Sequence, residues 1–124
     1  MQKRDAISWF EIAVKNVEKS RKFYEDVFQV KLITENDEEC QMLMFPFDEK
    51  NGIGGCLSHM EGFNPGPGGT MAYLNAEGDL DGALERTWTA GGKVLRERTP
   101  IPPHGFFAHI EDPEGNPVGL YSSS

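Results

Sequence analysis

Glu11 is an ionisable side chain inside residues 6–14, a run in which apolar and polar residues alternate as in a β-strand. Its neighbours on the same strand face are Trp9 and Ala13, and the other face, with Phe10, is expected to pack against a helix. We therefore expect Glu11 to point into a cleft, where burial would raise its pKa and suit it to general acid or base catalysis. Two alternatives stay open: a carboxylate paired with an arginine or lysine, or one exposed at the mouth of the cleft.

His109 is the second candidate for proton transfer. Pairing of the last two predicted strands across their turn places it opposite Gly119. A structural histidine, hydrogen-bonded within the sheet, is an equal alternative. The other two histidines, His59 and His104, are expected at a strand end and in a loop near the surface. The sequence shows no nucleophile elbow, paired-cysteine metal motif or Ser-His-Asp spacing.

Several aromatic and sulfur-containing side chains are candidates for lining a ligand pocket, because aromatic faces and thioethers accept varied ligands. They are Trp9, Met42, Met44 and Tyr121. Ordinary core packing is the alternative, since the strand register decides which face each side chain takes.

The first half of the chain positions Glu11 through a strand, a helix and three further strands. Residues 6–14 form the first strand, and Asn16 is the expected N-cap of a helix that runs to about Phe28. The further strands are expected at 30–35, 41–47 and 53–59. The helix should pack through one face at i, i+3, i+4 spacing, made of Val17, Ser20, Tyr24, Val27 and Phe28.

The second half repeats this order after the Gly/Pro-rich stretch 62–69, at a period of about 63 residues. It has a strand at 70–76, a helix from 79 to about 90, a strand at 93–99 and a hairpin of 106–111 with 117–121. We predict an α+β fold in which two βαβββ modules, about 6–60 and 70–122, form a curved mixed sheet around a cleft. The whole chain, 1–124, is expected to be one domain.

Composition limits the partners of the chain. Its 124 residues carry a formal net charge of −8, which would repel a phosphate backbone and argues against nucleic-acid binding. No apolar run is long enough for a membrane helix, and no signal peptide precedes the first strand, so a cytoplasmic location is expected. Both cysteines, Cys40 and Cys56, are expected to be reduced.

Two separated motifs carry a family resemblance. The helix that ends its second turn in Phe23-Tyr24, and the turn Asp112-Pro113-Glu114-Gly115-Asn116, stand in the order seen in one superfamily. The chain resembles the vicinal oxygen chelate superfamily of glyoxalases, bleomycin-resistance proteins and extradiol dioxygenases over nearly its whole length. The resemblance implies paired βαβββ modules around a cavity, and a homodimer.

The resemblance also implies where a metal would bind, since metal-dependent members place His, Glu or Gln on the first and last strands of each module. Here these positions hold Trp9, Cys56, Thr70 and Gly119. Tryptophan offers no lone pair, glycine has no side chain, threonine is a poor ligand, and a lone cysteine is more often a small core residue. We therefore expect no metal and no cofactor.

The expected function is binding of a small organic ligand without a metal. The predicted ligand-binding residues are Trp9, Glu11, Met44, Cys56, Thr70, His109 and Tyr121. The alternative is a glyoxalase-like lyase or isomerase in which Glu11 and His109 share the proton transfer.

Overall fold

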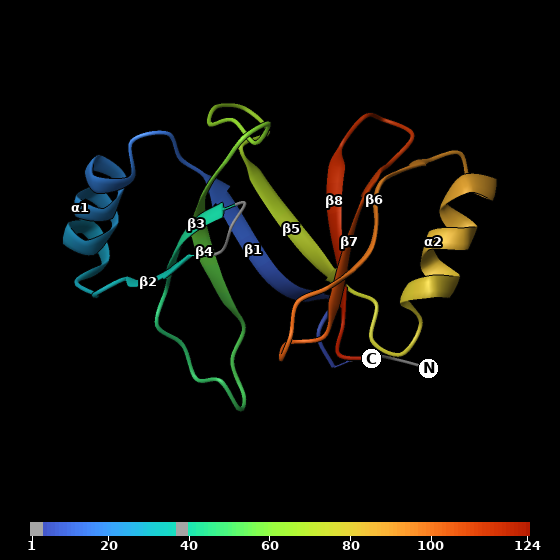
Figure 1. Ribbon diagram of the computed structural model, residues 1–124, viewed down its shortest axis with the longest axis horizontal. Helices are drawn as coiled ribbons and strands as arrows, with labels where there is room; N and C mark the ends of the chain where they lie inside the picture. Colours follow the sequence, from blue (N-terminus) through green and yellow to red (C-terminus); the bar gives the residue numbers. More distant parts are fainter. Residues whose placement is uncertain (1–3, 37–39) are drawn as a thin grey trace. The chain divides into compact units, whose positions relative to one another are not determined.

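The computed structural model describes residues 4–36 and 40–124, and within them the chain forms an α+β fold of eight strands and two helices (Figure 1). The strands belong to a mixed sheet, and the order strand, helix, three strands occurs twice along the chain. The predicted α+β class and the two βαβββ modules are confirmed.

The chain divides into two compact units at β1 and at the start of β5. One unit joins the residues up to Trp9 with Met71–Ser124, and the other is Phe10–Thr70. The two units therefore match the two modules, except that the first residues of β1 belong with the second module. A single domain and a cleft shared by both modules stay predictions.

The first module contains β1 (Ile7–Ala13), α1 (Val17–Phe28), β2 (Ile33–Asn36), β3 (Cys40–Met44) and β4 (Gly54–Met60). Helix α1 begins where predicted, because the Asn16 side chain accepts a hydrogen bond from the backbone N–H of Lys19 at 3.0 Å. It ends at Phe28, after which Gln29 takes the left-handed conformation with φ of 55°.

A small apolar core holds α1 to this sheet. It contains Val14, Leu32, Leu43 and Leu57, and Val17 and Tyr24 of α1 pack against it. The predicted helix face is correct for Val17 and Tyr24 and wrong for the last turn, where Val27 and Phe28 are exposed. That turn leads to β2, a four-residue edge strand whose residues are all exposed, so it has little apolar surface on which to pack.

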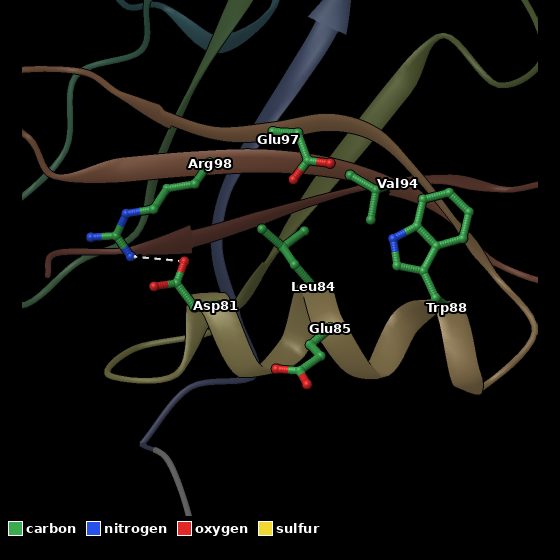
Figure 2. A pocket seen from close by; sticks show the side chains of 7 residues that line it. All are labelled: Asp81, Leu84, Glu85, Trp88, Val94, Glu97 and Arg98. Atoms are coloured by element: carbon green, nitrogen blue, oxygen red, sulfur yellow. Dashed lines mark ion pairs between the residues drawn. The ribbon is translucent and has the colours of Figure 1, made fainter.

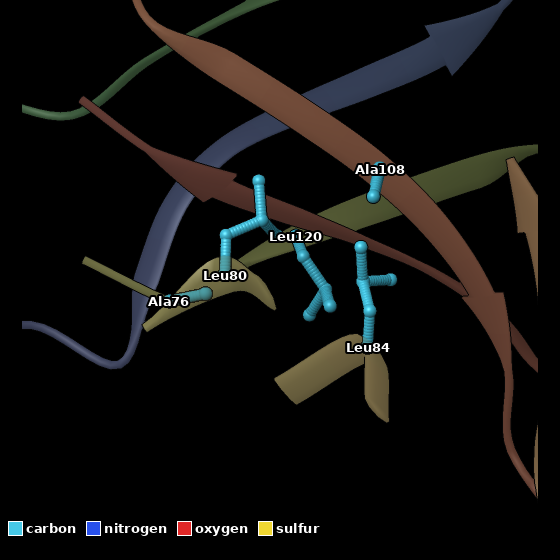
Figure 3. Packing of buried hydrophobic residues seen from close by; sticks show 5 residues of the cluster. All are labelled: Ala76, Leu80, Leu84, Ala108 and Leu120. Carbon is cyan, nitrogen blue, oxygen red and sulfur yellow. The ribbon is translucent and has the colours of Figure 1, made fainter. Parts of the chain in front are cut away.

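The second module contains β5 (Thr70–Asn75), α2 (Leu80–Thr89), β6 (Lys93–Pro100), β7 (Phe106–Glu111) and β8 (Pro117–Ser122). Strand β5 pairs with β8 in parallel, and β8, β7 and β6 follow in antiparallel order. Helix α2 packs on one face of this sheet through Ala76, Leu80, Leu84, Ala108 and Leu120 (Figure 3). The other sheet face carries the side chains that alternate with these.

The turn between β7 and β8 fixes the register of the hairpin. The Asp112 carboxylate accepts hydrogen bonds from the backbone N–H groups of Glu114 and Asn116, each at 2.9 Å. The Asn116 side chain, and after it these backbone N–H groups, hold the pKa of Asp112 below its usual value. The resulting register places His109 opposite Gly119, as predicted.

No helix among the described residues is long and apolar enough to cross a membrane.

Candidate functional site

In the second module, the face of the sheet that α2 does not cover carries His109. Strand residues alternate between the two faces of a sheet. Because Ala108 and Leu120 belong to the core beneath α2, their neighbours His109 and Gly119 lie on the opposite face. Tyr73 of β5 pairs with Gly119 and joins the same face. We call this surface, made of Tyr73, Arg96, Phe107, His109 and Gly119, the open face.

Tyr73 and His109 form a hydrogen-bonded pair on the open face, with 2.6 Å between the phenol oxygen and Nε2. Tyr73 is buried, with 6% of its surface exposed, whereas His109 is only partly buried. The absence of a side chain at Gly119 makes this position of Tyr73 possible: a Cβ atom there would lie 2.3 Å from the Tyr73 ring. Sequence reasoning missed Tyr73, whose contact with His109 spans 36 positions of the chain.

His109 is held as a neutral imidazole. Burial, and after it the positive charge of Arg96, lowers the pKa of His109 from 6.5 to about 4. The Phe107 ring lies beside it, with ring centroids 5.3 Å apart, and the Arg96 guanidinium lies 5.0 Å from the Phe107 centroid. At neutral pH the imidazole therefore offers one hydrogen-bond donor and one acceptor rather than a charge.

The first module has its own polar pair, Glu11 and Cys56. The fully buried Cys56 thiol points at a Glu11 carboxylate oxygen 3.9 Å away. Met44 of β3 lies opposite Cys56 in the ladder. Three of the predicted ligand-binding residues are thus neighbours within Phe10–Thr70.

The same backbone hydrogen bond occurs in both modules and shows which residues correspond. Val14 donates to the Ser58 carbonyl at 3.0 Å, and Ala76 donates to the Tyr121 carbonyl at 2.9 Å. Cys56 and Gly119 stand two residues before the acceptors Ser58 and Tyr121, so they correspond to each other. Glu11 and Tyr73 stand three residues before the donors Val14 and Ala76, so they correspond as well. The two modules therefore carry different pairs at one structural position.

This correspondence gives a different residue at one of the four positions expected for metal ligands. It places Met71, rather than Thr70, level with Trp9, because Met71 precedes Ala76 by the same five positions by which Trp9 precedes Val14. Thr70 is exposed at the first position of β5, and Met71 is buried.

A metal of the kind that the family resemblance implies does not fit these residues. Trp9 lacks a lone pair, and the space beside Gly119 is filled by the Tyr73 ring. Over residues 4–36 and 40–124, no three His, Cys, Asp or Glu side chains gather closely enough to hold a metal ion.

Of the remaining predicted residues, Tyr121 lies opposite Phe107 in the β7–β8 ladder and therefore on the open face, and Trp9 lies in β1. Trp9 is partly buried in β1, at the end of the segment that joins the second module. Tyr121 of β8 donates a hydrogen bond to the backbone carbonyl of His104, and burial raises its pKa. Glu11 and His109 belong to different units, so proton transfer shared between them stays a prediction.

A pocket of about 290 Å³ lies between α2 and β6, on the side of the second module's strands that the helix covers (Figure 2). Its walls include Leu84, Trp88 and Val94, and an ion pair of Arg98 with Asp81 at 3.4 Å closes one end. None of the predicted site residues lines it. The pocket and the open face are therefore separate surfaces of the second module.

Comparisons with known proteins agree on the fold. The model of the Glyoxalase/Bleomycin resistance protein/Dioxygenase superfamily matches residues 6–120. Methylmalonyl-CoA epimerase from Mycobacterium tuberculosis is similar in structure, with a TM-score of 0.70 and 14% identity over 100% of this chain and 93% of that chain. A Streptomyces coelicolor methylmalonyl-CoA epimerase variant, in complex with 2-nitronate-propionyl-CoA, gives a TM-score of 0.66 and 17% identity over 96% and 97%.

A Legionella pneumophila structure described as an NAD-dependent benzaldehyde dehydrogenase has a TM-score of 0.60 and 19% identity, over 92% of this chain and 96% of that chain. At these identities the structures show the fold alone. A search of curated protein sequences finds no match.

Proposed function

Because the chain belongs to the Glyoxalase/Bleomycin resistance protein/Dioxygenase superfamily, we propose that it binds a small organic molecule without a metal. The observation that carries this proposal is the packing of Tyr73 over Gly119. Where metal-dependent relatives would place a ligand side chain, this chain has an aromatic ring and a hydrogen-bonded Tyr73–His109 pair. Such a combination of apolar surface with a few fixed polar groups is typical of small-molecule sites.

The protonation of His109 favours binding over proton transfer. A general base works best when its pKa lies near the working pH, and a pKa of about 4 makes His109 a weak base at pH 7. The alternative function, a glyoxalase-like lyase or isomerase, would depend on Glu11 with His109. One observation supports this alternative function: the Glu11 carboxylate lies on a partly buried strand, beside the Cys56 thiol.

A ligand screen by thermal shift tests the proposed function. We expect chelator-treated protein to melt at a higher temperature with at least one small organic compound, because a ligand that binds the native state stabilises it. At a ligand concentration of 100 times Kd the gain is about 2.7 kcal/mol, several degrees for a chain of this size. The screen should include CoA esters, since a structural relative was solved with a CoA analogue.

The same compounds separate binder from enzyme. A binder returns every hit unchanged after long incubation. An enzyme converts a hit, and Glu11→Gln or His109→Asn then lowers the rate much more than the affinity. Hits that appear only after addition of a divalent metal would contradict the proposal. The expected homodimer and cytoplasmic location are further predictions, for sedimentation and cell fractionation to check.

A further inference from the structure

We infer that Tyr73 is a positioning residue that turns the Nδ1–H of His109 outward, as the donor for a carbonyl or carboxylate oxygen of a planar ligand. The inference rests on the proposed function and names the chemistry of its ligand. His109 contacts the ligand, and Tyr73 determines the orientation of the His109 N–H.

The two nitrogens of the His109 imidazole differ in their hydrogen bonds. Nε2 is bonded to the buried Tyr73 phenol at 2.6 Å, and within the described residues no hydrogen bond reaches Nδ1. Nor does any buried side-chain nitrogen or oxygen in those residues lack a partner, so Nδ1 is not sealed in the core. Nδ1 is therefore the nitrogen of His109 that remains for a hydrogen bond to a ligand.

The Tyr73 hydroxyl determines which nitrogen carries the proton. A neutral imidazole has one N–H and one acceptor nitrogen, and the assignment follows from its hydrogen bonds. A phenol, with a pKa near 10, is a stronger donor than a neutral imidazole N–H, and the imidazole nitrogen is a stronger acceptor than the phenol oxygen. The favoured arrangement has Tyr73 donating to Nε2, so the proton of His109 resides on Nδ1.

The surroundings of Nδ1 select the ligand. A donor N–H requires an acceptor, and the positive charge of Arg96, which also acts on His109, favours an acceptor oxygen rich in electrons. Phe107 offers its ring beside the imidazole, with centroids 5.3 Å apart, to a flat unsaturated group. A planar compound with a carbonyl or carboxylate oxygen satisfies both features.

The imidazole nitrogen signals of ¹⁵N-histidine-labelled protein test the orientation. At pH 7 we expect the His109 signals of the Nδ1–H tautomer, and Tyr73→Phe should produce a mixture of tautomers. Tyr24→Phe, which removes a hydroxyl from the other unit, is the matched control and should leave them unchanged. An Nε2–H tautomer in the wild type, or no change in Tyr73→Phe, would overturn the inference. The signals of His59 and His104 verify that each variant is folded.

Benzoate and benzylammonium test the ligand chemistry, because they share a ring and differ in the charge of the substituent. Benzoate should move the His109 signals in a saturable way, and Tyr73→Phe should weaken its binding by about three- to tenfold, the effect of one net hydrogen bond. Benzylammonium should leave them unmoved. If His109 responds equally to both probes, or if a thermal-shift hit binds without moving its signals, this inference fails and the proposed function stands. If no compound stabilises the protein, the proposed function fails.

Discussion

Gly119 influences the chemistry of the open face because it has no side chain. Its missing Cβ leaves the space that the Tyr73 ring occupies, and the ring brings its hydroxyl to His109. In the first module the corresponding pair is Cys56 with Glu11, a thiol beside a carboxylate. The two modules thus differ at both positions of the pair, and one module has a neutral tyrosine–histidine hydrogen bond where the other has a thiol beside a carboxylate.

The tight contact of Gly119 with Tyr73 predicts a specific coupling between the two residues. Gly119→Ala would place Cβ 2.3 Å from the Tyr73 ring, and such overpacking typically costs about 1–3 kcal/mol. In a Tyr73→Ala background the added methyl has room, so the same change should cost close to nothing. Urea unfolding of both single variants and the double variant measures the coupling. If the two effects simply add, the contact does not have the role assigned to it.

At the scale of elements, α2 is held by one side of its surface only. Leu80 and Leu84 are buried against the sheet, while Trp88 has 57% of its surface exposed above the pocket (Figure 2). The contribution of each apolar residue to the stability of α2 should therefore depend on how much of its side chain is buried, and not on the size of the side chain.

Two truncations on the same helix test this difference. We expect Leu84→Ala to lower the free energy of unfolding by about 2–5 kcal/mol, because it leaves a cavity in the core that Figure 3 shows. Trp88→Ala removes more atoms but little buried contact, so it should cost less than about 1 kcal/mol. Denaturant titrations compare the two. A larger loss for Trp88→Ala would show that the indole is covered in the native protein.

For the whole molecule, the shifted pKa values favour neutral pH. The folded state lowers the pKa of His109, Asp48 and Asp112. Each of these groups binds a proton more readily when unfolded, so acid favours unfolding. Lys22 and Tyr121 have raised pKa values, so stability is lost as the pH rises above 10. The most stable range lies between these limits.

His109 should dominate the loss of stability between pH 6.5 and about 4, the range between its unfolded and folded pKa values. We expect the free energy of unfolding to fall by roughly 2 kcal/mol across it, after an allowance for solvent screening. In His109→Asn the fall over this range should largely disappear, whereas in His104→Asn, at an exposed loop residue, it should persist. Urea titrations at pH 7, 5 and 4 make the comparison. An unchanged pH dependence in His109→Asn would rule out the assigned shift.

Local patterns in the sequence determined the elements and much of their order. Asn16 caps α1 with its own side chain, and Asp112 closes the hairpin by bonds to residues two and four positions away. Both are interactions between near neighbours, which a sequence shows directly. The hairpin register followed from the turn, and with it the place of His109 opposite Gly119.

The tertiary structure decided which side chains meet. Tyr73 reaches His109 only because β5 pairs in parallel with β8, which in turn pairs with β7. A parallel pairing joins strands far apart in the chain, so no local pattern reports its register. For the same reason the open face carries a tyrosine that sequence reasoning had not singled out.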